Sequence, residues 1–140
     1  MQSRKASCSC GHLEIEVSGE PAVVVACSCT NCQRRTGSAF GVSAYFPDDQ
    51  VMAKSGESKS FTNEGDSGGQ IERRFCPTCG STVFFSASFM PGSTGIAVGC
   101  FADPTFPQPI AAAWCESKHS WVSFPIGMPM SPNQDFTPKA

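Results

Sequence analysis

Hydrophobic and polar residues alternate over short stretches along most of this chain. The segment HLEIEV (residues 12–17) is the clearest case, because its leucine, isoleucine and valine share one face and its two glutamates share the other. Such alternation is typical of a half-buried strand. Further strands are expected over residues 22–26, 42–46, 50–54, 59–62, 71–75, 82–86, 95–101 and 110–115. Because no amphipathic segment of helical length separates these runs, the sequence predicts an all-β domain.

Glycine and proline interrupt the chain often. The 13 glycines and 11 prolines are too many for long helices. One helical turn is expected over residues 30–35, with Gly37 ending it, and a solvated hairpin loop over residues 63–70. A frayed start is expected at residues 1–7.

The length of 140 residues fits one domain with its own hydrophobic core. We expect this domain over residues 1–125, followed by a proline-rich, extended and loosely held tail over residues 126–140. Charged residues make up 16% of the chain and the formal net charge is −2, so neither nucleic acid nor an anionic membrane is expected as a partner. A secretory signal and a membrane-spanning apolar run are both absent from the sequence, which favours a cytoplasmic protein.

Nine cysteines are the main chemical feature of the sequence, and seven of them fall into three groups. The groups are Cys8 and Cys10; Cys27, Cys29 and Cys32; and Cys76 and Cys79. An odd count in a reducing compartment favours metal ligands over disulfides. The FCPTCG stretch that ends in Gly80 is typical of a zinc knuckle. A redox CxxC motif should open a long helix, whereas a strand is expected here.

The seven clustered cysteines are too few for two zinc sites with four cysteine ligands each. A closed zinc site needs four ligands, so Cys76 and Cys79 must recruit either Cys29 and Cys32 or Cys8 and Cys10, and the spacing leaves both choices open. Three sulfur atoms remain in either case. Their site keeps an open position unless another side chain completes it, and we interpret the four candidates as buried thiols or isolated histidines instead. These candidates are Cys100, Cys115, His12 and His119.

An open zinc site with three thiolates suits one kind of chemistry. The thiolates already neutralise the charge of the ion, so the ion should activate water less well than a site built from histidines. A soft metal with a free position instead favours the deprotonation of an incoming thiol. We therefore expect the addition of a thiol to an electrophile, or the reverse reaction.

Five stretches of the sequence carry a family resemblance. They are CSCG at 8–11, CSCTNCQRRTGSAFG at 27–41, RRFCPTCGS at 73–81, VGCFADP at 98–104 and ESKHSW at 116–121. With them the chain resembles the glutathione-dependent formaldehyde-activating enzyme family, which includes the centromere protein V-like proteins. Members of this family often have histidine where this chain has Ser28.

The resemblance implies a zinc-bound, tent-like, all-β fold of packed antiparallel sheets with two zinc ions. The structural ion would bind Cys8, Cys10, Cys76 and Cys79, and the open site would consist of Cys27, Cys29 and Cys32. The implied activity is that of a carbon–sulfur lyase. Family members are proposed to condense glutathione with formaldehyde to S-(hydroxymethyl)glutathione.

The function predicted from the sequence is thus a zinc-dependent carbon–sulfur lyase whose partners are a small thiol such as glutathione and an aldehyde. Arg34 and Arg35 could attract a carboxylate of the thiol, or they could form a solvated face. No residue is assigned as catalytic. The alternative is a non-catalytic, zinc-stabilised binding module, in which a protein partner would complete the three-cysteine site.

Overall fold

The computed structural model of the chain describes residues 2–64 and 68–136. The centre of the hairpin loop expected over residues 63–70, the end of the expected tail and Met1 lie outside the described residues. Within the described part, no helix is long and apolar enough to cross a bilayer.

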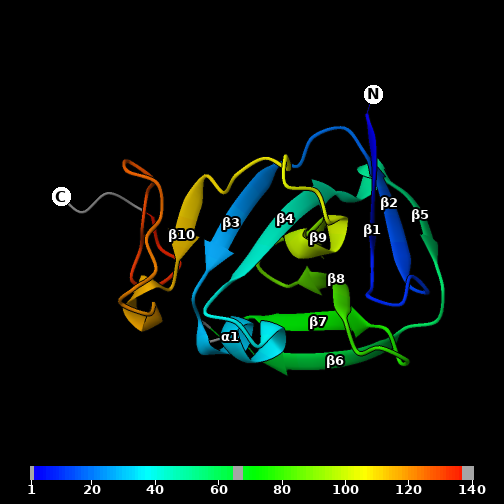
Figure 1. Ribbon diagram of the computed structural model, residues 1–140, viewed down its shortest axis with the longest axis horizontal. Coiled ribbons are helices and arrows are strands. Elements are labelled where there is room, and N and C mark those ends of the chain that lie inside the picture. Colours follow the sequence, from blue (N-terminus) through cyan, green and yellow to red (C-terminus); the bar gives the residue numbers. More distant parts are fainter. Residues whose placement is uncertain (1, 65–67, 137–140) are drawn as a thin grey trace.

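A seven-stranded sheet forms the larger part of the molecule (Figure 1). Its strand order is β10-β3-β4-β9-β8-β7-β6, and all neighbours are antiparallel except β10 and β3, which are parallel. The strands are β3 (Val23–Cys27), β4 (Gly41–Pro47), β6 (Lys59–Glu64), β7 (Gln70–Phe75), β8 (Thr82–Ala87), β9 (Ser93–Ala97) and β10 (Ala111–Ala113). The all-β fold expected from the alternation is confirmed.

A second, antiparallel sheet has the order β1-β2-β5. It consists of β1 (Ser3–Ser7), β2 (Glu14–Ser18) and β5 (Val51–Ser55). The expectation of a frayed start at residues 1–7 is therefore wrong for residues 3–7. Ala6 is fully buried there, and every residue of β1 pairs with a residue of β2. One apolar side chain in five residues leaves no period for sequence analysis to detect.

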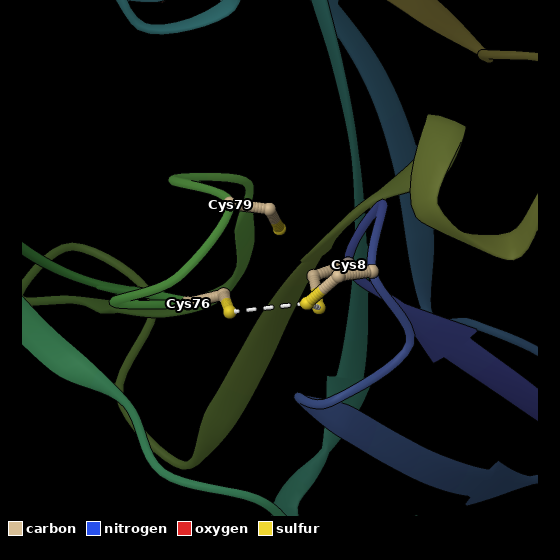
Figure 2. Close-up of side chains that lie close together, drawn as sticks. Cys8, Cys76 and Cys79 are labelled. Atoms are coloured by element: carbon tan, nitrogen blue, oxygen red, sulfur yellow. Dashed lines mark hydrogen bonds between the residues drawn. The ribbon is translucent and has the colours of Figure 1, made fainter.

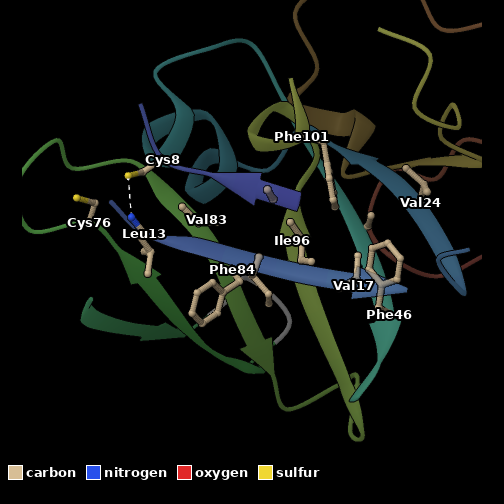
Figure 3. Close-up of a cluster of buried hydrophobic side chains, with 13 residues drawn as sticks. Cys8, Leu13, Val17, Val24, Phe46, Cys76, Val83, Phe84, Ile96 and Phe101 are labelled. Atoms are coloured by element: carbon tan, nitrogen blue, oxygen red, sulfur yellow. Dashed lines mark hydrogen bonds between the residues drawn. The ribbon is translucent and has the colours of Figure 1, made fainter. Parts of the chain in front are cut away.

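The hydrophobic core lies between the two sheets. Leu13, Ile15 and Val17 from the β2 region meet Phe46 of β4 and Ile96 of β9, and all five are almost fully buried (Figure 3). Alternate residues of a strand point to opposite faces, so the strands of the large sheet direct their remaining side chains away from this core. That second face provides most of the cavity described below.

Short helices connect several strands. The expected helical turn is confirmed as α1 (Thr30–Thr36), which ends at Gly37 with a φ of 64°. The 3₁₀ helices are η1 (Asp48–Gln50), η2 (Val98–Phe101) and η3 (Cys115–Ser117). The strands expected over residues 95–101 and 110–115 are consequently too long. The first continues as η2, and Trp114, with a φ of 55°, leaves the extended conformation directly after β10.

The segment after η3 returns to the edge of the large sheet. Met130 forms a parallel bridge with Ala112, and the backbone N–H of Trp114 donates to the carbonyl of Asn133 at 2.7 Å. In Figure 1 this segment, in orange and red, runs next to β10. The described part of the expected loose tail is thus held by hydrogen bonds, while the division of the chain at residue 125 stays a prediction.

Candidate metal centres

Four cysteines meet where the two sheets come together. Cys8 and Cys10 lie in the connection between β1 and β2, and Cys76 and Cys79 lie in the turn between β7 and β8 (Figure 2). The sulfur of Cys10 is 3.6 Å from that of Cys8 and 3.6 Å from that of Cys76. Four sulfurs bound tetrahedrally at about 2.3 Å from zinc would lie about 3.8 Å apart. The four-cysteine cluster therefore fits a closed zinc site.

The backbone around the four-cysteine cluster supports anionic sulfur. The N–H of Leu13 donates to Cys8 Sγ at 3.2 Å, and the N–H of Thr78 donates to Cys76 Sγ at 3.4 Å. Hydrogen bonds with the Ser81 side chain and backbone lower the pKa of Cys79 to about 5. Donors of this kind favour the thiolate form, which is the form that binds a metal ion.

The three-cysteine cluster forms at the junction of β3 and α1. Cys27 ends β3, Cys29 caps the N-terminus of α1, and Cys32 lies in its first turn, with its N–H donating to Cys29 Sγ at 3.3 Å. All three sulfur atoms lie within 4.8 Å of one another. The half-buried β3 thus places the first thiol, and one helical turn brings the other two to it.

Protons are shared unevenly among these three sulfurs. Hydrogen bonds from the Cys27 and Cys29 thiols, assisted by the Arg35 guanidinium, lower the pKa of Cys32 to about 3. Hydrogen bonds with Cys29 and Cys32, together with burial, raise the pKa of Cys27. A cation bound between the sulfurs would remove this competition, because it would replace the remaining thiol protons. The three-cysteine cluster is therefore chemically suited to a metal ion.

None of the four candidates for a further ligand joins either cluster in the described residues. His12 Nε2 accepts a hydrogen bond from the N–H of Glu57 at 2.9 Å, and His119 Nε2 is 3.2 Å from Gln33 Oε1. Gln33 in turn donates to the carbonyls of Ser28 and Ser117, which fixes α1 to the following segments. The two remaining candidates are the half-buried Cys100 and Cys115.

A cavity of about 390 Å³ opens onto the three-cysteine cluster. Its wall is the second face of the large sheet, with contributions from Val25 of β3, Tyr45 of β4, Ile71 of β7 and Phe85 of β8. Gly95 of β9 makes room for this wall, because a Cβ atom there would lie 2.2 Å from the Phe85 ring. The volume is in the range of small-molecule sites, and the lining is mostly apolar, as in such sites.

Two arginines line this cavity, and the sequence analysis named only one of them. Arg35 is half-buried, and its guanidinium lies 5.7 Å from the Phe85 ring centre. Arg34 is exposed, in agreement with the solvated-face alternative. Arg73 of β7 was missed, although its position two residues after Ile71 places both side chains on one strand face.

The fold and these clusters define a small β protein with two cysteine clusters able to hold metal ions, one closed and one open to a cavity. The family model of the glutathione-dependent formaldehyde-activating enzyme matches residues 3–117, and the chain belongs to this family. The resemblance noted in the sequence is confirmed.

Among solved structures, the crystal structure of a protein from Rhodobacter sphaeroides is similar to this chain. The two share 24% sequence identity with a TM-score of 0.52, and the match covers 69% of this chain and 85% of the other. At that identity the similarity demonstrates the fold alone. No curated protein matches the sequence.

Proposed function

We propose that this protein is a zinc-dependent carbon–sulfur lyase that joins a thiol such as glutathione to an aldehyde such as formaldehyde, and that also catalyses the reverse reaction. One observation carries the proposal: the three-cysteine cluster borders a cavity of about 390 Å³, and no fourth ligand joins it from the described residues. Membership of the formaldehyde-activating family supports the substrates. The product with these substrates would be S-(hydroxymethyl)glutathione.

The metal ligands in this proposal are the seven clustered cysteines. Cys8, Cys10, Cys76 and Cys79 would hold a structural zinc ion, and Cys27, Cys29 and Cys32 a second one, giving two per chain. When bound, the second ion would stabilise the thiolate form of the substrate. Thiolate ligands also require a reducing compartment, which supports the cytoplasmic location expected from the sequence.

The reaction needs one bond to form and one proton to move. The substrate sulfur attacks the aldehyde carbon, the π electrons of the carbonyl pass to its oxygen, and that oxygen takes up the proton that the thiol lost. Tyr45 lines the cavity, and burial raises the pKa of its hydroxyl to about 12. The hydroxyl therefore stays protonated at neutral pH, and we propose that it donates a hydrogen bond to the developing oxygen anion.

The substitution Cys32→Ser tests the proposal, with Cys115→Ser as the matched control outside both clusters. Cys32→Ser should leave a folded protein with one zinc ion per chain and should abolish adduct formation from glutathione and isotope-labelled formaldehyde, followed by NMR. Cys115→Ser should keep two ions and full activity. A folded Cys32→Ser protein with one ion and unchanged activity would refute the proposal.

A second experiment separates the enzyme from a binding module. Cobalt replaces zinc in such sites and reports its ligands by its absorption spectrum. The spectrum of the cobalt-loaded protein should change when glutathione is added, because a fourth sulfur would join the three-cysteine site. An unchanged spectrum would favour the non-catalytic alternative.

A further inference from the structure

Arg73 is a buried cation that has no acidic partner among the residues the structure describes. Its side chain is only 7% exposed and lines the cavity. One terminal nitrogen, Nη1, donates to the side-chain oxygen of Asn63, whereas Nε has no hydrogen-bond partner among the described residues. The neighbouring Arg74 points to the other face of β7 and pairs with Glu72 at 3.5 Å. The two adjacent arginines therefore have opposite environments.

Burial of a guanidinium is unfavourable unless an anion compensates its charge. Burial lowers the pKa of Arg73 and the charge of nearby Arg35 lowers it further, whereas the Cys32 and Cys29 sulfurs act in the opposite direction. No aspartate or glutamate is among the described residues that line the cavity. In the described part of the chain, the cavity thus holds two arginines and no carboxylate.

The two arginines have different neighbours. Arg35 interacts with Cys32, whose pKa it helps to lower, and lies over the Phe85 ring. Its charge is therefore directed at the three-cysteine cluster. Arg73 lines the cavity and hydrogen-bonds to Asn63 through Nη1, whereas its buried Nε has no acceptor among the described residues. The planar guanidinium group is suited to binding the two oxygens of a carboxylate.

We propose that Arg73 binds a carboxylate of the thiol substrate and thereby determines which thiols the cavity accepts. The proposal rests on the proposed function, because one molecule would present its sulfur to the three-cysteine cluster and its carboxylate to Arg73. Apolar residues that line the cavity, such as Val25 and Ile71, would contact the carbon chain of that molecule. Arg73 is thus a specificity-determining residue, and a thiol without an anionic group is a poor ligand.

A pair of small thiols tests this inference on the zinc-loaded protein. The compounds 3-mercaptopropionate and 3-mercaptopropionamide differ in the carboxylate alone, and isothermal titration calorimetry measures the affinity of each. The wild-type protein should bind the carboxylate about tenfold to a hundredfold more tightly than the amide, the usual range for a hydrogen-bonded charge. Arg73→Gln should abolish this preference, and the control Arg74→Gln should retain it.

The outcomes separate this inference from the proposed function. Equal affinity of the wild-type protein for both thiols, or a preference that survives in Arg73→Gln, would overturn the role of Arg73 while leaving thiol binding intact. Absence of binding by either thiol would refute the proposed function instead. In that case, or if Arg73→Gln does not fold, propionate is titrated into the wild-type protein and the Arg73 Nε–H signal is followed by NMR. A saturating shift supports the carboxylate site, and an unchanged signal overturns it.

Discussion

Replacement of Cys76 by serine tests the four-cysteine cluster most directly. Cys76 is fully buried, belongs to the hydrophobic core and accepts a hydrogen bond from the N–H of Thr78. If its only role were packing, the hydroxyl would cost about 1–3 kcal/mol of unfolding free energy, the usual penalty for a poorly paired buried polar group. If Cys76 holds a structural zinc ion, the loss is on the order of 10 kcal/mol.

The larger loss is comparable with the whole stability of a domain, about 5–15 kcal/mol. Cys76→Ser should therefore be largely unfolded, which circular dichroism would show. Elemental analysis should show that the variant has lost this zinc ion. The companion Cys79→Ser removes an exposed sulfur and leaves no hole, so it should lose the same ion without any packing defect. Cys115→Ser serves as the control. A soluble, cooperatively folding Cys76→Ser protein that lacks this zinc, with a loss below about 3 kcal/mol, would refute the structural role of the cluster.

Three further predictions concern the sheet and the cavity. Gly95→Ala should lower the unfolding free energy by about 1–3 kcal/mol in urea, because its Cβ would meet the Phe85 ring, whereas Gly99→Ala has no atom within 4 Å and should be close to neutral. Phe46→Ala removes a fully buried ring and should cost about 3–5 kcal/mol, measured in the same way. Tyr45 is the one tyrosine of the chain, and its phenolate absorbance after a rapid pH jump should report a pKa of about 12. Because this pKa lies above the unfolded value of about 10, the stability that Tyr45 contributes is complete below pH of about 10 and is lost as the pH rises through 12. Ionisation near pH of about 10 in the folded protein would contradict the burial argument.

Alternation of apolar residues predicted several strands because alternate residues of strands such as β2 and β3 are buried in the core. The segment 12–17 shows this well, since Leu13, Ile15 and Val17 are all buried as expected. The alternation of apolar residues fails to predict a strand, or its end, where backbone conformation or pairing with another strand decides the structure. Trp114, in a left-handed conformation, ends β10 although the apolar run continues, and β1 pairs along its whole length although Ala6 is its one buried residue.

Spacing alone could not divide the cysteines between the clusters, because the division depends on contacts between distant segments. The turn that carries Cys76 could have met either of two other cysteine groups. It meets Cys8 and Cys10 because the β1–β2 connection of one sheet lies against the β7–β8 turn of the other. The family resemblance implied this grouping, and the geometry brings the same four residues together.

Sequence analysis missed Arg73 for the same reason, because its environment also depends on contacts between segments that are distant in the sequence. In the stretch ERRF nothing distinguishes the arginine that faces a cavity from the one that faces solvent, since both could pair with the adjacent glutamate. The difference comes from the register of β7, which places Arg73 opposite Phe85 of β8 and on the face of Ile71. Burial, and not sequence, identifies Arg73 as the arginine of this pair that has no carboxylate partner in the described part of the chain.

The strands β7 and β8 connect the four-cysteine cluster to one wall of the cavity. Arg73 lies three residues before Cys76 on the same strand end, and Phe85 lies on the strand that follows Cys79. A metal ion bound by the four-cysteine cluster would hold the turn between these two strands against the small sheet and would thereby support the strand pair that carries one wall of the cavity. If the cluster opened, the Arg73 side chain would lose its defined position relative to Cys32, although neither residue belongs to that cluster. If a metal ion occupies the four-cysteine cluster and the cavity binds a carboxylated thiol as proposed, loss of this ion would therefore also weaken substrate binding.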